Sequence, residues 1–397
     1  MAMSGPAPIY DPYDPATLLD PYPAYRRLRD EAPVYHEPRR DFWVLSRFAD
    51  VFGAVGDPAT FSSAQGLTFE KDEILKLGLA PTLVMMDRPA HTAFRRLISR
   101  GFTPRRVATL EPAVRGFVRR RVAAIAEAGE ADFVAELAGP LPTLVVATYL
   151  GVPEADRAQF DAWSAAIVSA NAQGNGVTGA AGAVADLYRY FSALVERRRQ
   201  EPGDDLLSDL VAAEVDGEPL DLAQILGYCF VMIAGGNDTV TGLLGGAAVL
   251  LTERPDQRRL LIETPGRIPG AVEELLRLTS PVQGLCRTTT RQVTVGTTTI
   301  PAGKKVHLLY GSANRDPREW GPSADELDVS RRIPRMLAFG GGPHHCIGAA
   351  AARLQGRVAL EELLGALPEF AADPGQGRFA PGPFVRRYES LPVLAAP

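Results

Sequence analysis

Hydrophobic residues recur along most of this chain every three or four positions, which is the spacing typical of amphipathic helices. The pattern predicts an early helix in PAYRRLRDEAP (residues 23–33) and another that begins near Pro89, because proline suits the first turn of a helix. Further helices are predicted at Leu110–Ala128, Pro142–Leu150, Glu154–Ala170, Ala180–Arg199 and Asp205–Glu214. The chain is therefore expected to be mainly α-helical.

Strand-like patterns are confined to short segments. Residues 34–36 and 42–45 are rich in β-branched and aromatic side chains. The sequence RQVTVGTTTIPAGKKVHLLY (residues 291–310) predicts a β-hairpin with Gly296 and Gly303 at its turns. There is no internal repeat and no linker long enough to separate domains. The predicted fold class is mainly α with small β-sheets.

The segment Leu222–Thr252 is apolar on all sides and contains a single charged residue, Asp238. The uncharged runs before and after Asp238 are 16 and 14 residues long. Both are shorter than the roughly 20 residues that a membrane-spanning helix needs, so the segment is predicted to be a central core helix. The alternative is a break at Gly235-Gly236, after which Asn237 or Asp238 would cap a second helix.

The overall composition excludes several classes of protein. The 397 residues carry a net charge of −5, and Lys and Arg form only short clusters, so no nucleic-acid-binding surface is expected. The N-terminal sequence MAMSGPAPIYDPYDP resembles neither a signal peptide nor a membrane anchor. The three cysteines, Cys229, Cys286 and Cys346, are far apart, which argues against a disulfide framework. These features predict a cytoplasmic protein without a membrane partner.

Candidate metal ligands gather in the sequence FGGGPHHCIG, residues 339–348. His344, His345 and Cys346 are adjacent, so their side chains diverge, and no second cluster exists to complete a zinc site. A buried, inert cysteine is one interpretation. However, the following sequence IGAAAARLQGRVALEELLGAL predicts a helix, which places Cys346 at a helix N-terminus that favours a thiolate. A single anionic sulfur in a glycine-rich loop suits the axial position of haem iron.

This loop resembles the haem-binding loop of the cytochrome P450 superfamily, and the matching residues are Phe339, Gly340, Gly342, His344, Cys346 and Gly348. The resemblance implies that Cys346 is the proximal iron ligand of haem b. It also implies that Phe339 shields the sulfur and that His344 reaches a haem propionate. No role is assigned to His345.

Two further matches concern the haem propionates. His91 and Arg95, in the sequence HTAFR, are four residues apart and share one face of their helix. This spacing alone is compatible with an ordinary exposed pair. The resemblance implies instead that both residues bind a propionate and that Arg287 is another propionate ligand. Arginine suits this role because its planar fork matches a carboxylate.

The sequence AVEELLRLTSP matches another pattern of the same superfamily. Glu274 and Arg277 are three residues apart and therefore share a helix face. As an exposed pair they would contribute little, but the resemblance to the E-x-x-R motif implies a buried pair that supports the haem side of the fold. The third member of this network is either Arg331 or Arg332, and the sequence leaves both open.

The central apolar segment resembles the oxygen-binding segment of the superfamily, through Gly235, Gly236, Asn237, Asp238 and Thr239. Each glycine inside a helix lowers helix stability by about 1 kcal/mol relative to alanine. The resemblance implies that these glycines open a groove for dioxygen. Asp238 and Thr239 match the acid–alcohol pair that relays protons. Val240 departs from the pattern, because many members have a second threonine there. We expect this departure to change side contacts rather than the chemistry.

The resemblance spans residues 10–395, so residues 1–397 are expected to form one haem-thiolate domain with no fused reductase and no membrane anchor. It implies a monomeric monooxygenase that inserts one oxygen atom of O2 into a bulky hydrophobic small molecule. Electrons would come from NAD(P)H through a separate ferredoxin and ferredoxin reductase. The alternatives are a peroxide-using haem-thiolate enzyme, a non-catalytic haem protein and a zinc or structural protein.

The family pattern also indicates which segments line the substrate site. They correspond to Leu67–Val84, Ala165–Ala181, Met232–Gly236, Val282–Leu285 and Pro383–Val385. These segments are apolar or small apart from the charged residues Glu70, Lys71, Asp72, Glu73 and Lys76. This composition favours a hydrophobic compound without a strong charge, but the sequence does not identify the substrate.

Overall fold

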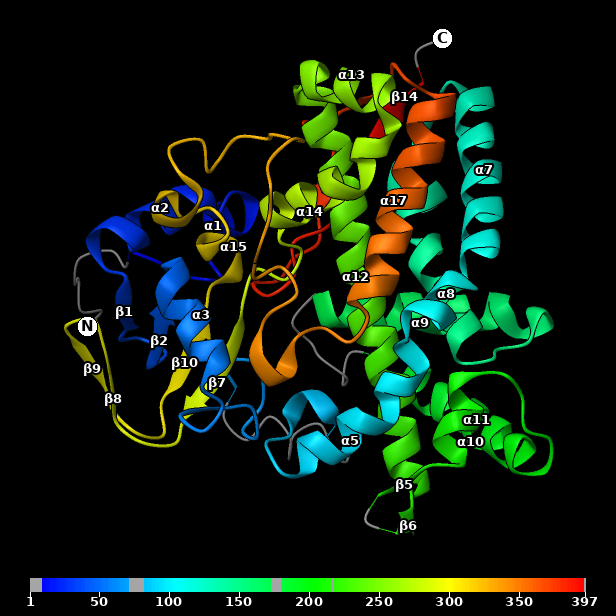
Figure 1. The fold of residues 1–397 in the computed structure, drawn as a ribbon, viewed down its shortest axis with the longest axis horizontal. Coiled ribbons are helices and arrows are strands. Elements are labelled where there is room, and N and C mark those ends of the chain that lie inside the picture. Colours follow the sequence, from blue (N-terminus) through cyan, green and yellow to red (C-terminus); the bar gives the residue numbers. More distant parts are fainter. Residues whose placement is uncertain (1–8, 71–81, 173–179, 216, 396–397) are drawn as a thin grey trace.

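The structure is a computed structural model, and it describes residues 9–70, 82–172, 180–215 and 217–395. Figure 1 shows two regions side by side, a helical region around a long central helix and a smaller region that contains most of the strands. The predicted fold class, mainly α with small β-sheets, is confirmed. None of the helices in the described ranges combines the length and the apolar character that crossing a membrane requires.

The helical region follows the predicted pattern closely. Its helices are α5 (Ala90–Ser99), α6 (Pro104–Ala108), α7 (Glu111–Ala128), α8 (Pro140–Tyr149), α9 (Arg157–Ala172), α10 (Ala181–Gln200), α11 (Leu206–Val211), α12 (Leu222–Glu253), α13 (Pro255–Glu263), α14 (Ile268–Thr279) and α17 (Ala349–Ala366). The prediction of a helix to Glu214 was wrong at its end, because Glu214–Val215 forms strand β5 and pairs with β6 (Glu218–Pro219). The other predicted helices are present with ends shifted by a few residues.

Helix α12 runs unbroken through Gly235-Gly236, so the alternative of a break there is wrong. Its first turn is fixed by a capping box in which Asp221 accepts from the Gln224 N–H and Gln224 accepts from the Asp221 N–H. The helix packs against α8, α9, α14 and α17. Because it is surrounded in this way, it buries apolar side chains on nearly every face, as the uncharged sequence predicts.

The strands form several small sheets. The largest has the order β1-β2-β10-β7-β3, with bounds β1 (Val34–Glu37), β2 (Phe42–Leu45), β10 (Lys305–Leu308), β7 (Leu285–Thr289) and β3 (Phe61–Ser62). A second sheet has the order β11 (Ala371–Ala372), β14 (Pro392–Leu394) and β4 (Glu130–Asp132), and β12 (Arg378–Phe379) pairs with β13 (Tyr388–Ser390); β5–β6 and β8–β9 form two further pairs. The smaller region also contains α1 (Pro15–Leu19), α2 (Tyr22–Glu31), α3 (Phe48–Gly56), α15 (Tyr310–Ala313) and α16 (Pro317–Trp320).

The predicted hairpin at residues 291–310 is only partly correct. Strands β8 (Val293–Val295) and β9 (Thr298–Ile300) do form a hairpin, and Gly296 turns it with a φ of +58° that favours glycine. Residues 305–308, however, leave this hairpin and form β10 in the largest sheet. There β10 is parallel to β2 and antiparallel to β7. Both partner strands lie outside residues 291–310, so the local sequence pattern could not indicate either pairing.

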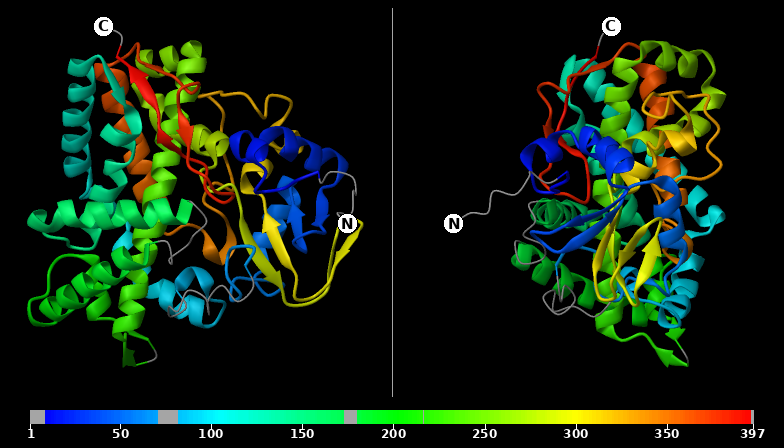
Figure 2. Two further views of the ribbon diagram at one scale, coloured as in Figure 1. Left: turned by 180° about the vertical axis from the view of Figure 1, so that it is seen from behind. Right: turned by 90° about the vertical axis from the view of Figure 1, so that its left-hand side faces the viewer.

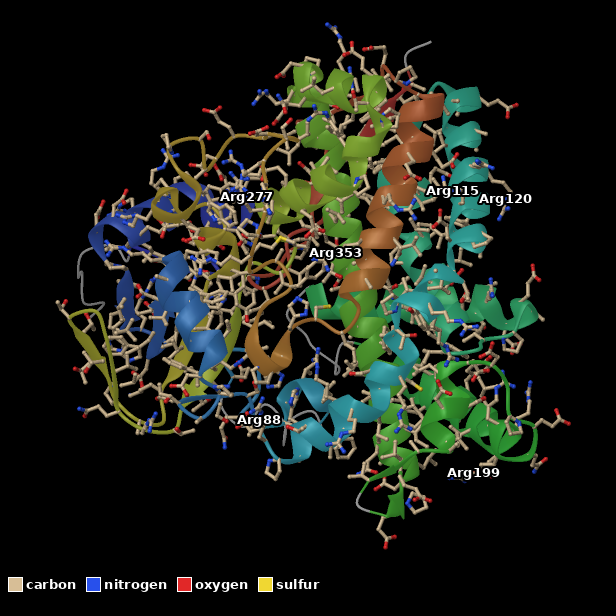
Figure 3. All side chains as sticks on the ribbon, viewed as in Figure 1. Arg88, Arg115, Arg120, Arg199, Arg277 and Arg353 are labelled. Carbon is tan, nitrogen blue, oxygen red and sulfur yellow. The ribbon has the colours of Figure 1, made fainter. Side chains whose placement is uncertain are left out.

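Helices α7 and α17 are joined by a network of charged side chains. Arg115 of α7 donates to Glu111 on its own helix and to Glu361 and Glu362 on α17, at 2.5–2.7 Å. Arg357 of α17 donates back to Glu111 at 2.5 Å. Figure 3 shows Arg115 on α7 beside α17. The network fixes α17, and α17 in turn fixes the loop that precedes it.

Candidate functional site

The loop before α17 is shaped by glycines that no other residue would replace without strain. Gly340 and Gly342 have φ values of +64° and +58°. A Cβ atom at Gly342 would lie 2.1 Å from the carbonyl oxygen of Val55 in α3, and one at Gly341 would lie 2.7 Å from Val55 Cγ2. The loop closes on itself, because the Cys346 N–H donates to the Phe339 carbonyl at 2.9 Å. These contacts hold Cys346 at a fixed position.

Cys346 precedes α17 by three residues and its side chain is exposed. The surrounding protein nevertheless raises the pKa of its thiol by burial, while the Gly348 N–H, Arg95 and Arg353 act to lower it. The sulfur is thus enclosed on most sides and open on one. A cation bound on the open side would stabilise the thiolate. Cys229 and Cys286, in contrast, are buried.

Phe339 is buried at the start of the loop and is covered by an arginine. The Arg353 guanidinium carbon lies 4.6 Å from the centre of the Phe339 ring. Arg353 is itself held by Glu273 of α14, with Nε and Nη2 at 2.6 and 2.9 Å from the two carboxylate oxygens. Figure 3 shows Arg353 at the end of α17 nearest the loop. The aromatic ring is therefore fixed beside the cysteine.

His91, Arg95 and Arg287 come together with His344 of this loop. The rings of His91 and His344 are 4.2 Å apart, and His344 Nε2 lies 3.2 Å from Ser63 Oγ. Arg95 donates to the His345 carbonyl at 2.5 Å. Arg287, in β7, donates to the Cys286 carbonyl at 2.8 Å and acts on the His344 ring, whose pKa it lowers. The pair His91–Arg95 is not an ordinary exposed pair, because His91 is only 2% exposed.

Among the described residues, this cluster of donors has no carboxylate partner of its own. His91 Nε2 is buried and has no hydrogen-bond partner among the described residues. Burial is the main cause that lowers the pKa of His91 and that of His344, the latter to about 3. No carboxylate in the described residues forms an ion pair with Arg95 or Arg287, and Asp87 is already engaged by Ser62 and the Ser63 N–H. The arrangement fits one or two carboxylates from a bound group.

The glycine pair of α12 has two different functions in the packing. A Cβ atom at Gly236 would lie 2.9 Å from Val146 Cγ2, so this glycine permits close contact with α8. A Cβ atom at Gly235 would meet nothing within 4 Å, and Gly235 is exposed, so open space adjoins the middle of the central helix there. Thr239 Oγ1 donates to the Gly235 carbonyl at 3.1 Å. The hydroxyl is thus held one turn from the open space. Val240 is buried.

Asp238 is 3% exposed and forms an ion pair with Arg387, which precedes β13. Burial raises the pKa of Asp238 to about 6, and the Arg387 guanidinium opposes this rise. A carboxyl group with this pKa exchanges protons readily near neutral pH. Arg387 was not singled out by the sequence, because nothing in the sequence around position 387 indicates a contact with position 238.

Glu274 and Arg277 are fully buried and form a bidentate pair at 2.7 and 2.8 Å. Arg331 completes the network, with Nε 3.1 Å from Glu274 Oε1, whereas Arg332 is exposed. Arg277 also donates to the Asn314 carbonyl at 2.7 Å, and Asn314 Oδ1 accepts from the Leu337 N–H at 2.8 Å. The network therefore reaches the segment just before Phe339. Figure 3 shows Arg277 near α14.

Two of the segments predicted to line the substrate site lie partly outside the described residues, namely 67–84 and 165–181. The charged residues Lys71, Asp72, Glu73 and Lys76 belong to that part. The segments 282–285 and 383–385 lie side by side, as Val282 and Val385 form a β-bridge and the Gln283 N–H donates to the Phe384 carbonyl at 2.7 Å.

Comparison with known proteins gives a consistent result. A family model described as Cytochrome P450 matches residues 268–371. The chain is 56% identical over 385 residues to cytochrome P450 130 of Mycobacterium tuberculosis, with 95% of each chain covered. It is 38% identical to vitamin D(3) 25-hydroxylase of Pseudonocardia autotrophica, with 95% of this chain and 94% of that protein covered. The solved structure of cytochrome P450 CYP109Q5 from Chondromyces apiculatus matches with a TM-score of 0.88 at 33% identity, and 98% of each chain is covered.

Proposed function

Because this chain belongs to the cytochrome P450 family of oxidoreductases, we propose that it inserts one oxygen atom of dioxygen into a bulky hydrophobic small molecule. The observation that supports this most strongly is the pairing of two features in one place. An exposed cysteine stands on a glycine turn, and the same loop adjoins a cluster of donors that includes the buried, unpartnered His91 Nε2.

The residues of this site fit haem b. In our proposal Cys346 would ligate the haem iron through its thiolate, and Phe339 beside it would limit access of water to the sulfur. Gly340 and Gly348 would leave room for close approach of the group, and His91, Arg95, Arg287 and His344 would bind the carboxylates of haem. When bound, haem supplies dioxygen activation, and a thiolate ligand favours O–O cleavage.

In our proposal, the middle of α12 handles protons and provides space. A Cβ atom at Gly235 would meet nothing within 4 Å, and in our proposal this open position leaves room for dioxygen. Thr239 positions its hydroxyl against the Gly235 carbonyl, where it can orient a water molecule. Asp238 takes up and releases protons, because its pKa lies near neutral pH. We propose that these two residues are the catalytic ones.

The substrate class is inferred from two sources. A relative at 38% identity is named a vitamin D(3) 25-hydroxylase, which acts on a large apolar molecule. The described lining segments Met232–Gly236 and Val282–Leu285 contain no charged side chain. We further propose a single cytoplasmic, monomeric haem-thiolate domain that receives electrons from NAD(P)H through a separate ferredoxin and its reductase.

The test is the spectrum of the reduced carbon monoxide complex. The wild-type protein should show the red-shifted Soret band of a thiolate-ligated haem. Cys346→Ser and Cys346→His should lose this band, whereas Cys229→Ala and Cys286→Ala, at the two buried cysteines, should keep it. Haem content and circular dichroism identify variants that fail to fold. Retention of the band in a folded Cys346→Ser protein would disprove the assignment.

A substrate screen completes the test. Hydrophobic compounds of graded size are added to the purified protein, and a change from low-spin to high-spin absorption identifies those that displace water from the site. We expect large neutral compounds to give this change. Product formation is then measured with NADH, a ferredoxin and a ferredoxin reductase. A protein that binds these compounds but forms product only with hydrogen peroxide would contradict the proposed electron route.

A further inference from the structure

A pocket opens on the side of α12 that faces the C-terminal segment. It has an empty volume of about 880 Å³ and lies between the second half of α12, the end of α14 and β12–β13. Sites for small molecules typically have volumes of about 300–1,000 Å³. Figure 2 (left) shows the red C-terminal segment running along α12, in agreement with the packing of β13 on that helix. The cysteine loop, Gly235 and Thr239 do not line this pocket, so it lies outside the proposed haem site.

Much of the pocket surface is apolar. Val249 and Leu250 of α12 and Leu278 of α14 line it with aliphatic side chains. Phe379 of β12 and Tyr388 of β13 also line it, and their rings stack with centres 4.0 Å apart. A surface of this kind suits the apolar part of a small molecule, because binding removes apolar area from water.

Several of the charged residues that line the pocket are already neutralised by ion pairs. Arg387 pairs with the buried Asp238, and Arg315 pairs with Asp325 at 3.2 Å. Arg315 also donates to the Leu278 carbonyl at 3.0 Å. These residues therefore leave little net charge for a ligand to recognise. The charges that remain belong to Arg386 and Glu253.

Arg386 lines the pocket, and no carboxylate in the described ranges forms an ion pair with it. Its Nη1 donates to the Leu18 carbonyl at 3.0 Å, and its guanidinium carbon lies 3.8 Å from the centre of the Phe379 ring. Its backbone is held as well, since its N–H donates to the Pro281 carbonyl at 2.8 Å. A guanidinium that is already held in place loses little conformational freedom when it binds a carboxylate.

Glu253 provides the opposite charge. It is the last residue of α12 and is exposed where it lines the pocket. It forms no ion pair with another residue of the described part of the chain. Burial raises the pKa of Tyr388 to about 12, while the charge of Arg386 lowers this pKa and that of Glu253 raises it. Both charges thus act on the hydroxyl of one residue in the pocket, which places them near each other.

This combination of charges selects the kind of ligand. A molecule with a carboxylate alone would gain from Arg386 but be repelled by Glu253. A molecule with an ammonium group alone would meet the reverse situation. A molecule that carries both groups next to an apolar side chain satisfies both charges and the apolar surface at once.

We propose that this pocket is a binding site for an α-amino acid with a large apolar side chain. Arg386 binds the carboxylate, Glu253 binds the ammonium group, and the apolar side chain lies against the aliphatic residues of α12 and α14. The site lies outside the proposed haem site, and binding there does not depend on the monooxygenase function.

The test compares ligands that share one ring and differ in charge. The haem-loaded protein is titrated by calorimetry with L-phenylalanine, phenylpropionate, which lacks the ammonium group, and phenylethylamine, which lacks the carboxylate. L-Leucine and L-tryptophan are titrated in the same way. The best of the amino acids should bind about tenfold or more tightly than either singly charged compound. Its binding should leave the Soret band unchanged, because the pocket is separate from the haem site.

Three results would overturn the proposal. They are the absence of binding by all of the amino acids, equally tight binding of a singly charged analogue, and a Soret change that follows the binding curve. The last result would place the ligand at the haem instead. None of these results bears on the spectrum of the reduced carbon monoxide complex, so the proposed function is judged separately.

Variants of the two charged residues assign the contacts. Arg386→Gln should weaken L-phenylalanine and phenylpropionate about tenfold but not phenylethylamine, and Glu253→Gln should weaken L-phenylalanine and phenylethylamine but not phenylpropionate. Arg386→Lys retains the charge and should retain most of the affinity. Arg259→Gln and Glu263→Gln are the matched controls, because both residues are exposed on α13 and lie outside the pocket.

Folding is checked by circular dichroism. Because Glu253 is exposed and unpaired within the described ranges, Glu253→Gln should fold normally even if Arg386→Gln does not. Val249→Trp, which fills the pocket, should abolish binding of L-phenylalanine. Wild-type affinity for L-phenylalanine in folded Glu253→Gln or Val249→Trp would show that the amino acid binds elsewhere and would overturn the assignment.

Discussion

Glu273 and Glu274 are adjacent residues of α14, and each forms a bidentate ion pair with one arginine. They differ in burial: the side chains of Glu274 and Arg277 are both 0% exposed, whereas those of Glu273 and Arg353 are 25% and 40% exposed. Removing one partner of a buried pair leaves an uncompensated charge and costs about 3–5 kcal/mol. An exposed pair contributes about 0–1 kcal/mol. The same substitution at the two positions should therefore have very different effects.

We predict that Glu274→Gln lowers the free energy of unfolding by about 3–5 kcal/mol. The expected loss lies toward the upper end, because Glu274 faces two cations, Arg277 and Arg331. Glu273→Gln should lower it by less than about 1 kcal/mol. Urea unfolding followed by circular dichroism gives both values from the shift in midpoint. Equal losses at the two positions, or a loss below 1 kcal/mol for Glu274→Gln, would refute the reasoning from burial.

Three further predictions concern the haem site and the β region. The Arg287→Ala protein should release haem to apomyoglobin faster than the wild type and keep the spectrum of a thiolate-ligated haem. If Arg287→Ala and Arg95→Ala both release haem at the wild-type rate, neither arginine belongs to the proposed site. The Thr239→Ala protein should bind haem and substrate normally, but it should form more peroxide and less product for each NADH consumed. An unchanged yield of product per NADH would show that Thr239 has only a packing role. His307 is fully buried, and burial lowers its pKa to about 3, although a hydrogen bond with the Gly284 backbone opposes this shift. Its contribution to stability is complete above its usual pKa of 6.5 and falls by roughly 1 kcal/mol per pH unit below it. In His307→Leu the free energy of unfolding, measured by urea unfolding from pH 7 to 4, should fall less steeply with falling pH than in the wild type. An equally steep fall would contradict this role of His307.

Much of this fold follows from short-range patterns. The uncharged run around Asp238 predicted a central helix, and the capping box at Asp221 and the packing on every side explain why it forms. The glycine-rich loop and the helix after it could be placed because both depend on residues near Cys346. The spacing of Glu274 and Arg277 predicted that they share a helix face, whereas their burial was implied only by the resemblance to the E-x-x-R motif.

The features that the sequence did not determine depend on where a side chain points or on contacts between residues far apart in the chain. Arg331 and Arg332 have identical chemistry, and only the path of the irregular chain after α16 decides which of them points at Glu274. The departure of residues 305–308 from the hairpin depends on pairing with β2, far away in the chain. Arg387 reaches Asp238 only because the C-terminal segment packs on α12. No local periodicity encodes these contacts.

The cysteine loop and the region of α12 around Asp238 differ in how firmly hydrogen bonds and ion pairs hold them. Behind the cysteine loop, the polar groups are saturated: Arg277 satisfies carbonyls, and Asn314 fixes the Leu337 N–H. A saturated buried network resists movement, because any shift leaves a polar group without a partner. Around Asp238 the ion pair with Arg387 stands almost alone, beside an open pocket. The loop side is therefore suited to hold a cofactor rigidly, while the α12 side is suited to change its protonation during each turnover.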